Sequence, residues 1–138
     1  MELHDSVYEK IQQLSQQGNS FVDKSKLSKA IQCFEEAIQL LPNPKEDWEA
    51  STWLYTALGD TYFQDKQYHE ALLNLSSAFK CPNGLGNPFI MLRMGESLYE
   101  IADMAKAREY LLQAYMLVGP DIFKGEDPGY LAAINDLL

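Results

Sequence analysis

Two acidic side chains, Asp60 and Glu96, have the clearest chemical potential in this sequence. Paired carboxylates that approach each other can act as a general acid and a general base. Neither is accompanied by a nucleophile, a set of metal ligands or a cofactor motif. The sequence therefore predicts no enzyme and no cofactor, and it favours a role for both acids in a binding surface.

The histidines and a glycine-rich segment give weaker chemical signals. His4 and His69 lie far apart and have no cysteine or carboxylate at ligand spacing. We therefore expect no metal site, and we expect His69 to lie at a solvated helix start. Residues 84–88, Gly-Leu-Gly-Asn-Pro, resemble a phosphate-binding loop before a helix but follow no strand. We expect them to form a turn.

The cysteines and the start of the chain bear on location. Cys33 and Cys81 form no CxxC or CxH pattern, so we expect two reduced, structural thiols. The first residues lack a basic segment followed by an apolar run, which a secretory signal would have. No stretch approaches the roughly 18 apolar residues of a membrane span. A cytoplasmic location without a membrane partner is the default expectation.

Composition and charge limit the class of partner. Hydrophobic residues make up 46% of the 138 residues, which is typical of one globular domain over residues 1–138. The chain has 11 Lys and Arg against 20 Asp and Glu, and its net charge is -9. A nucleic-acid partner would need clustered basic residues, so we exclude one. An acidic surface favours a basic partner instead.

A threefold internal repeat defines the elements that position these residues. Each of Gly18, Gly59 and Gly95 is followed at the same distance by an alanine, then at plus four by a large apolar residue and at plus seven by another alanine. The three sets are Ala30, Phe34, Ala37; Ala71, Leu75, Ala78; and Ala107, Leu111, Ala114.

This spacing predicts pairs of closely packed helices. Offsets of four and seven place three side chains on one helix face. Alanines are small where helices cross closely, and the Phe or Leu fills the space between them. A glycine within a helix costs about 1 kcal/mol relative to alanine, so its presence in all three copies indicates close approach of the paired helix.

Turn and capping residues divide the chain into three helix pairs. We expect turns within the pairs at residues 23–26, 65–67 and 102–103, and breaks between the pairs at 42–44, 81–87 and 119–121. Asn87 before Pro88, and Asp127 before Pro128, are suited to begin a helix as N-cap and first-turn proline. Asp5 or Ser6 is expected to cap the first helix.

The order of these residues resembles the tetratricopeptide repeat (TPR), whose pattern is Trp-x2-Leu-Gly-x2-Tyr, then Ala-x3-Phe, Ala and Pro. The resemblance covers roughly residues 11–121. It implies an all-α, right-handed superhelical α-solenoid of three helix hairpins, at about 11–44, 52–85 and 88–121, with a C-terminal capping segment at 122–138. The matching residues are Leu14, Gly18, Phe21, Ala30, Phe34, Ala37 and Pro42; Tyr55, Leu58, Gly59, Tyr62, Ala71, Leu75, Ala78 and Pro82; and Met91, Met94, Gly95, Leu98, Ala107, Leu111, Ala114 and Pro120.

Two segments depart from the repeat. Residues 45–51 are a surplus before the second pair, which we interpret as an early helix start, with a loop insertion as the alternative. Residues 128–138 form a last amphipathic stretch that is expected to be a helix covering the open end of the third hairpin, with Ile122 and Phe123 packed there too.

The family implies that the first helix of each hairpin lines a concave groove. Rotation away from the packing face selects the groove residues, and exposed aromatics beside a few charges are typical of binding hot spots. We therefore expect a protein or peptide partner with an apolar anchor and basic character. The alternative is that some aromatics pack against neighbouring helices or the cap. The groove candidates are Gln12, Ser15, Asn19 and Val22; Trp53, Thr56, Asp60 and Phe63; and Phe89, Leu92, Arg93, Glu96 and Tyr99.

Two interpretations of the function stay open, and one known binding mode of the family is disfavoured. TPR domains that bind the acidic tails of heat-shock chaperones use two Lys, two Asn and one Arg, whereas the matching positions here are Ser15, Asn19, Ala57, Phe89 and Arg93. A chaperone-tail adaptor is therefore disfavoured. The leading interpretation is a scaffold or adaptor. The alternative is an inhibitor or immunity-type protein that neutralises one basic partner such as a toxin. Homodimerisation through the cap also stays open.

Overall fold

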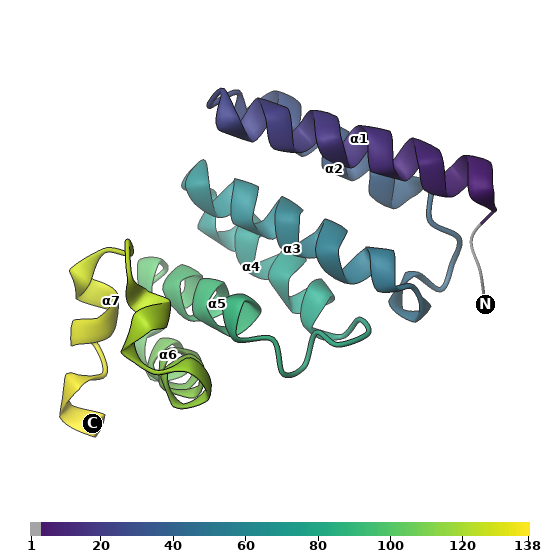
Figure 1. The fold of residues 1–138 in the computed structure, drawn as a ribbon. Coiled ribbons are helices and arrows are strands. Elements are labelled where there is room, and N and C mark those ends of the chain that lie inside the picture. Colours follow the sequence, from purple (N-terminus) through teal and green to yellow (C-terminus); the bar gives the residue numbers. More distant parts are fainter. Residues whose placement is uncertain (1–3) are drawn as a thin grey trace.

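The computed structural model describes residues 4–138 and contains three antiparallel helix hairpins that stack in chain order (Figure 1). The first helices of the hairpins lie in one layer and the second helices behind them. The hairpins are α1 (Asp5–Asp23) with α2 (Leu27–Gln39), α3 (Glu49–Gln64) with α4 (Tyr68–Phe79), and α5 (Pro88–Glu100) with α6 (Met104–Val118). A short α7 (Pro128–Ala132) follows, and 3-10 turns span η1 (Lys45–Asp47), η2 (Pro120–Phe123) and η3 (Asn135–Leu137).

The predicted glycine contacts hold the hairpins together. A Cβ atom built on Gly18 would lie 2.7 Å from the Phe34 ring, and one on Gly59 would lie 2.6 Å from Leu75. The same atom on Gly95 would lie 2.8 Å from Leu111. These distances are far below van der Waals contact, so only glycine lets the paired helix approach this closely. The close approach predicted from the repeat is confirmed in all three hairpins.

Each hairpin also turns through the same backbone conformation. Ser25, Lys66 and Ala102 follow their glycines at equal distance and have φ values of 58°, 60° and 66°. In the first turn the amide of Lys26 donates to the carbonyl of Phe21 at 2.8 Å, as in a Schellman motif, and the other two turns have the equivalent bond. The turns therefore fall where the sequence places them, but with left-handed residues other than glycine.

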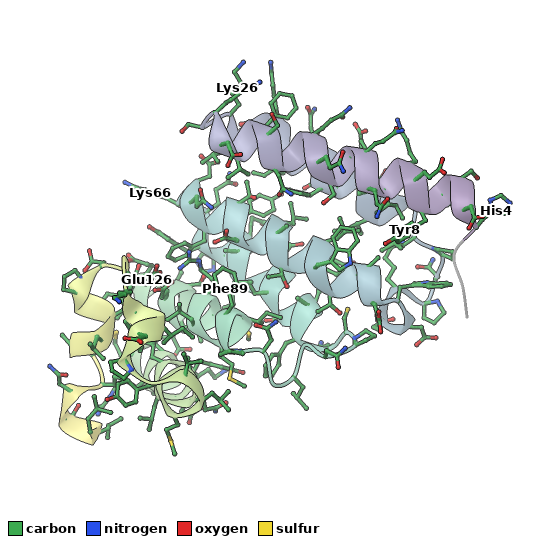
Figure 2. All side chains as sticks on the ribbon, viewed as in Figure 1. His4, Tyr8, Lys26, Lys66, Phe89 and Glu126 are labelled. Carbon is green, nitrogen blue, oxygen red and sulfur yellow. The ribbon has the colours of Figure 1, made fainter. Side chains whose placement is uncertain are left out.

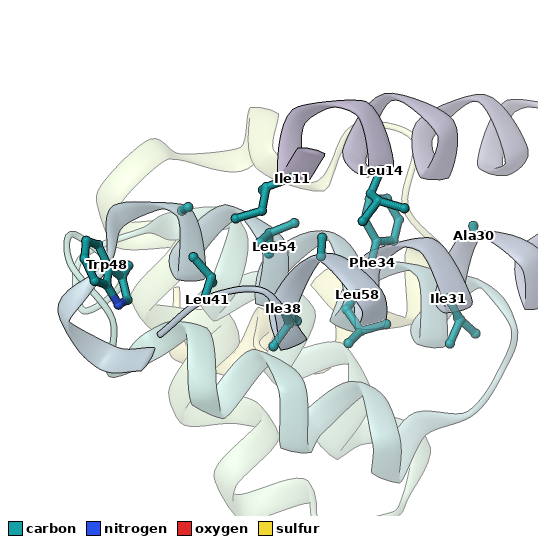
Figure 3. Packing of buried hydrophobic residues seen from close by; sticks show 12 residues of the cluster. Ile11, Leu14, Ala30, Ile31, Phe34, Ile38, Leu41, Trp48, Leu54 and Leu58 are labelled. Carbon is teal, nitrogen blue, oxygen red and sulfur yellow. The ribbon is translucent and has the colours of Figure 1, made fainter. Parts of the chain in front are cut away.

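The core runs through the stack as three hydrophobic clusters. Figure 3 shows the first, in which Phe34 of α2 lies among residues of α1 and α3. The alanines of the repeat are fully buried, as their place at the helix crossings requires. Cys33 and Cys81 are buried and free. None of the helices within residues 4–138 combines the length and apolar character needed to cross a membrane.

The surplus segment before the second hairpin is a packed corner. Residues 45–47 form η1, and α3 begins only at Glu49, so the segment combines a loop insertion with a slightly early helix start. The Trp48 side chain is buried, and its Nε1 donates to the carbonyl of Pro42 at 2.8 Å. The Ser51 hydroxyl donates to the carbonyl of Lys45 at 2.5 Å.

Helix ends agree with the sequence at two positions and differ at two. The Asn87 side chain accepts hydrogen bonds from two amides of α5, and Asp127 accepts one from Gly129, so both predicted caps are confirmed. His4, rather than Asp5 or Ser6, caps α1, because its Nδ1 accepts from the amide of Ser6. The capping segment is less helical than expected, since α7 has 5 residues and η3 follows it.

The glycine contacts give a stability prediction. We expect Gly59→Ala to lower the free energy of unfolding by about 1 to 2 kcal/mol, because over-packing costs about 1–3 kcal/mol and better helix propensity recovers about 1. Gly86→Ala is the control, since its new Cβ meets nothing within 4 Å. Urea denaturation of both variants measures the difference. Wild-type stability in Gly59→Ala would contradict the packing argument.

Candidate partner-binding groove

A pocket opens where α3 meets the loop between α4 and α5 and the first turn of α5. Its volume is about 420 Å³. We call it the Trp53 pocket. Trp53 and Phe89 supply its aromatic walls and are 39% and 37% exposed. The lining residues are Glu49, Thr52, Trp53, Thr56, Ala57, Asp60, Pro82, Asn83, Asn87 and Phe89.

Local geometry explains why these side chains meet. The six lining residues between Glu49 and Asp60 recur every three or four positions, so they share one face of α3. The Thr52 hydroxyl donates to the carbonyl of Pro82 at 2.6 Å and ties the loop to α3. Asn87 then caps α5 by accepting from the amide of Phe89 at 2.9 Å, which fixes the backbone beneath the second aromatic wall.

The pocket lining is mainly apolar but includes acidic side chains. Its lining has two carboxylates, Glu49 and Asp60, and contains no Lys, Arg or His. The hydroxyl and amide groups of the other lining residues offer hydrogen bonds. This combination can hold an apolar side chain and favours a positive charge beside it.

Next to the pocket, Arg93 of α5 binds three acidic side chains. Its Nε donates to Asp60 Oδ1 at 2.7 Å, and one terminal nitrogen donates to Glu96 Oε1 at 2.6 Å and to Glu126. Its guanidinium carbon lies 4.9 Å from the ring centroids of both Phe63 and Phe89. Burial lowers the pKa of Arg93, but the bonds to Asp60 and Glu96 raise it more, so Arg93 stays charged.

Glu96 is the most buried member of this cluster, with 0% of its side chain exposed. Its pKa is raised to about 9, mainly by burial and secondly by a hydrogen bond with Glu126, although Arg93 opposes the shift. Its Oε2 atom is buried and accepts no hydrogen bond from any group in residues 4–138. A protonated Glu96 can donate a hydrogen bond to the Glu126 carboxylate. Glu96 is therefore neutral at neutral pH and acts as a hydrogen-bond donor.

The structure divides the groove residues predicted from the sequence. Trp53, Thr56, Asp60 and Phe89 line the Trp53 pocket. Asn19 is exposed on α1 and Val22 packs against the first hydrophobic cluster, both outside this pocket. Gln12 is exposed and Ser15 half-buried on the same helix.

Among the other predicted groove residues, Leu92 and Glu96 are buried, whereas Phe63, Arg93 and Tyr99 are half-buried. The chain after α6 (residues 119–138, the C-terminal segment) packs on α5 and α6, which leaves Leu92 only 2% exposed and Glu96 fully buried. The Tyr130 ring lies 5.2 Å from Tyr99 and 6.5 Å from Phe63 between ring centroids. The expectation that Leu92 and Glu96 face a partner is wrong for this conformation, because the chain's own C-terminal segment covers them.

Sequence reasoning missed several residues in and beside the Trp53 pocket. Glu49 and Thr52 share the α3 face of Trp53, so extending the helical periodicity backwards would have found them. The loop residues Pro82 and Asn83, and Glu126 in the C-terminal segment, have no periodic signal. No set of three or more His, Cys, Asp or Glu side chains in the described part of the chain could hold a metal ion.

The buried carboxyl group gives a pH prediction. Because folding raises the pKa of Glu96 from 4.5 to about 9, the folded state binds more protons between these values. Unfolding free energy therefore falls as the pH rises from about 5 to 9, with Glu96 contributing up to about 1.4 kcal/mol per pH unit. Glu96→Gln should flatten this fall, because the amide is neutral throughout.

Urea denaturation of wild type, Glu96→Gln and Asp136→Asn across this pH range tests the assignment. Asp136 is an exposed acid paired with Arg108, so its amide variant should keep the wild-type pH slope. Equal slopes for wild type and Glu96→Gln would show that Glu96 is ionised in the fold.

The comparisons with known proteins identify the fold. No protein-family model and no curated protein matches the sequence. The C-terminal TPR-containing domain of a Plasmodium falciparum protein described as FK506-binding has a TM-score of 0.79 and 20% identity, covering 99% of this chain and 94% of that chain. The Yersinia enterocolitica type III secretion chaperone SycD, solved with a peptide of the translocator YopD, has a TM-score of 0.73 and 18% identity, with coverage of 94% and 92%.

A third solved structure agrees with these two. The second TPR domain of human RPAP3, solved with an HSP70 peptide, has a TM-score of 0.72 and 14% identity, covering 95% of this chain and 97% of that chain. At such identities the likeness establishes the architecture and leaves ligand chemistry to the residues themselves. The chain has the tetratricopeptide-repeat fold, built as an α-solenoid of three helix hairpins with a short C-terminal cap.

Proposed function

We propose that this chain is a non-enzymatic interaction module that binds a partner protein or peptide through the groove centred on the Trp53 pocket. One observation carries the proposal: two aromatic side chains from different hairpins, each more than one third exposed, line a single pocket together with two acidic side chains. Exposed aromatics in a concave site are the residues that most often dominate binding energy.

The apolar walls favour an apolar anchor on the partner. Ala57 and Pro82 line the pocket together with Trp53 and Phe89. An apolar side chain that enters it would therefore be shielded from water on several sides. The fold already fixes the loop and the start of α5 by hydrogen bonds, so little ordering cost remains on binding.

The charges favour a basic group beside that anchor. Glu49 and Asp60 line the pocket without a basic neighbour among the lining residues, and the whole chain has a net charge of -9. Arg93 is close by, but its guanidinium is engaged by three acidic side chains. A cationic side chain would therefore meet a negative potential, and an acidic peptide would be repelled.

Structures of the same fold support peptide binding as the mode. SycD was solved with a translocator peptide and a human RPAP3 domain with an HSP70 peptide. Their ligands are not transferred to this chain, because the positions matching the lysines of the chaperone-tail clamp are not lysine here. Only the general mode, a peptide in the groove, is carried over.

The excess of acidic residues, 20 against 11 basic ones, also supports a second candidate, an inhibitor of one basic partner such as a toxin. Affinity co-purification from the native host, washed at low and high salt, separates the two. One stoichiometric partner lost at high salt supports inhibition, whereas several substoichiometric partners support an adaptor.

Matched peptides test the proposed chemistry directly. We expect acetyl-Phe-Arg-amide to bind more tightly than acetyl-Phe-Gln-amide, and roughly tenfold more tightly than acetyl-Phe-Glu-amide, because reversing one charge beside a carboxylate changes the energy by about 1–2 kcal/mol at the surface. NMR titration of the nitrogen-labelled protein measures the affinities. The Trp53 indole signal, assigned with Trp48→Phe, should shift with the arginine peptide.

Variants locate the site. Trp53→Ala and Phe89→Ala should each weaken the arginine peptide about fivefold or more, as expected for hot-spot residues. Leu73→Ala is the matched control, since Leu73 is an exposed apolar residue on the second helix of the same hairpin. Equal affinity for all three peptides, or loss of binding only in Leu73→Ala, would overturn the proposal.

A further inference from the structure

We infer that Glu126 is a positioning residue for the Trp53 pocket: from the C-terminal segment it holds Arg93, and Arg93 in turn holds the Phe89 wall. This inference rests on the proposed function of that pocket and adds a residue that does not line it. Figure 2 shows Glu126 on the C-terminal segment and Phe89 on α5, on the same side of the molecule. Arg93 is the side chain that links them.

The first link joins Arg93 to the pocket wall. Phe89 is 37% exposed, so packing alone leaves much of its ring uncovered. The Arg93 guanidinium lies over this ring, 4.9 Å from its centroid, and equally near the Phe63 ring. A cation held between two aromatic rings restricts both of them. The direction of the Phe89 ring therefore depends on where the guanidinium is fixed.

The second link joins Arg93 to the C-terminal segment. The same terminal nitrogen of Arg93 donates to Glu96 and to Glu126, while Nε donates to Asp60. Asp60 and Glu96 come from α3 and α5, whereas Glu126 reaches the cluster from the loop between η2 and α7. With Glu96 neutral, Glu126 and Asp60 are the two anions that fix the guanidinium from different elements.

Contacts on both sides of Glu126 hold it at the cluster. Before it, Phe123 is buried against α5 and α6. After it, the Tyr130 hydroxyl donates to Glu100 at 2.7 Å. Gly125 has φ of 80°, which lets the chain turn directly before Glu126. The segment therefore presents one carboxylate to Arg93 at a set position.

Removing that carboxylate should loosen the wall without removing the pocket. In Glu126→Gln the side chain keeps its size and loses its charge, so Arg93 loses one of its two anions and Phe89 its fixed support. A ligand must then order the ring itself, which lowers affinity. The coupling is reciprocal. If the contact between Glu126 and Arg93 strengthens ligand binding, the bound ligand stabilises that contact by the same free energy.

The test uses the acetyl-Phe-Arg-amide probe and two isosteric variants of the C-terminal segment. We expect Glu126→Gln to weaken the probe about threefold to tenfold, by NMR titration. Asp136→Asn removes another acid of the same segment that pairs with Arg108 instead, and its affinity should stay within twofold of wild type. Circular dichroism checks that both variants are folded.

Amide hydrogen exchange tests the reverse direction on the wild-type chain. Saturating probe should slow exchange of the α7 amides by the same threefold to tenfold, although these amides lie outside the pocket. In Glu126→Gln this slowing should disappear. The wild-type arm does not depend on any variant being folded.

The outcomes separate this inference from the proposed function. If the probe fails to bind wild type, the proposed function fails and this inference with it. If the probe binds wild type and Glu126→Gln equally, or if the probe does not change the exchange rates of the α7 amides, the positioning role of Glu126 is wrong. The proposed function of the pocket is unaffected by either result. If Glu126→Gln and Asp136→Asn weaken probe binding equally, the C-terminal segment as a whole supports the pocket, and the specific positioning role of Glu126 is wrong.

Discussion

The close contact between each repeat glycine and the large side chain of the paired helix is the constraint on which the structure depends. Gly18 lies against Phe34, Gly59 against Leu75 and Gly95 against Leu111, at separations that would not admit even one methyl group. Because the contact is the same in each copy, the hairpins have nearly the same shape and can stack in register. Stacking places α3 and α5 side by side, which lets Trp53 and Phe89 share a pocket.

Much of the fold follows from short-range patterns and could be predicted. The glycine and alanine spacing predicts helix faces, and Asn87 and Asp127 predict helix starts. Both predictions succeed because they depend on interactions between residues that are close in sequence. The sequence predicts the positions of the hairpin turns but not their backbone conformation. Ser25, Lys66 and Ala102 have left-handed backbone angles, although none of them is the glycine that usually indicates this conformation. The turn bonds and the packing of the hairpin outweigh the local cost.

The site was predictable where helical periodicity reaches it. Trp53, Thr56 and Asp60 lie on one face of α3, so rotation from the packing face selects them. The covering of Leu92 and Glu96 was not predictable, because it depends on the C-terminal segment returning to α5. No periodicity within α5 indicates which segment will cover it, and a glutamate in an irregular loop, such as Glu126, has no pattern at all.

The cluster of three acids around Arg93 costs free energy, because its charged groups are buried. Three acids around one arginine at a mostly buried position lose hydration, and apolar residues of similar volume often stabilise such a site better. Neutralisation of Glu96 reduces the excess negative charge, which leaves one cation between two anions from α3 and from the C-terminal segment. Such an arrangement is satisfied in only one geometry, whereas an apolar contact tolerates many. The cluster therefore fixes three elements that are distant in sequence at the edge of the Trp53 pocket, where the direction of an exposed aromatic ring matters for binding.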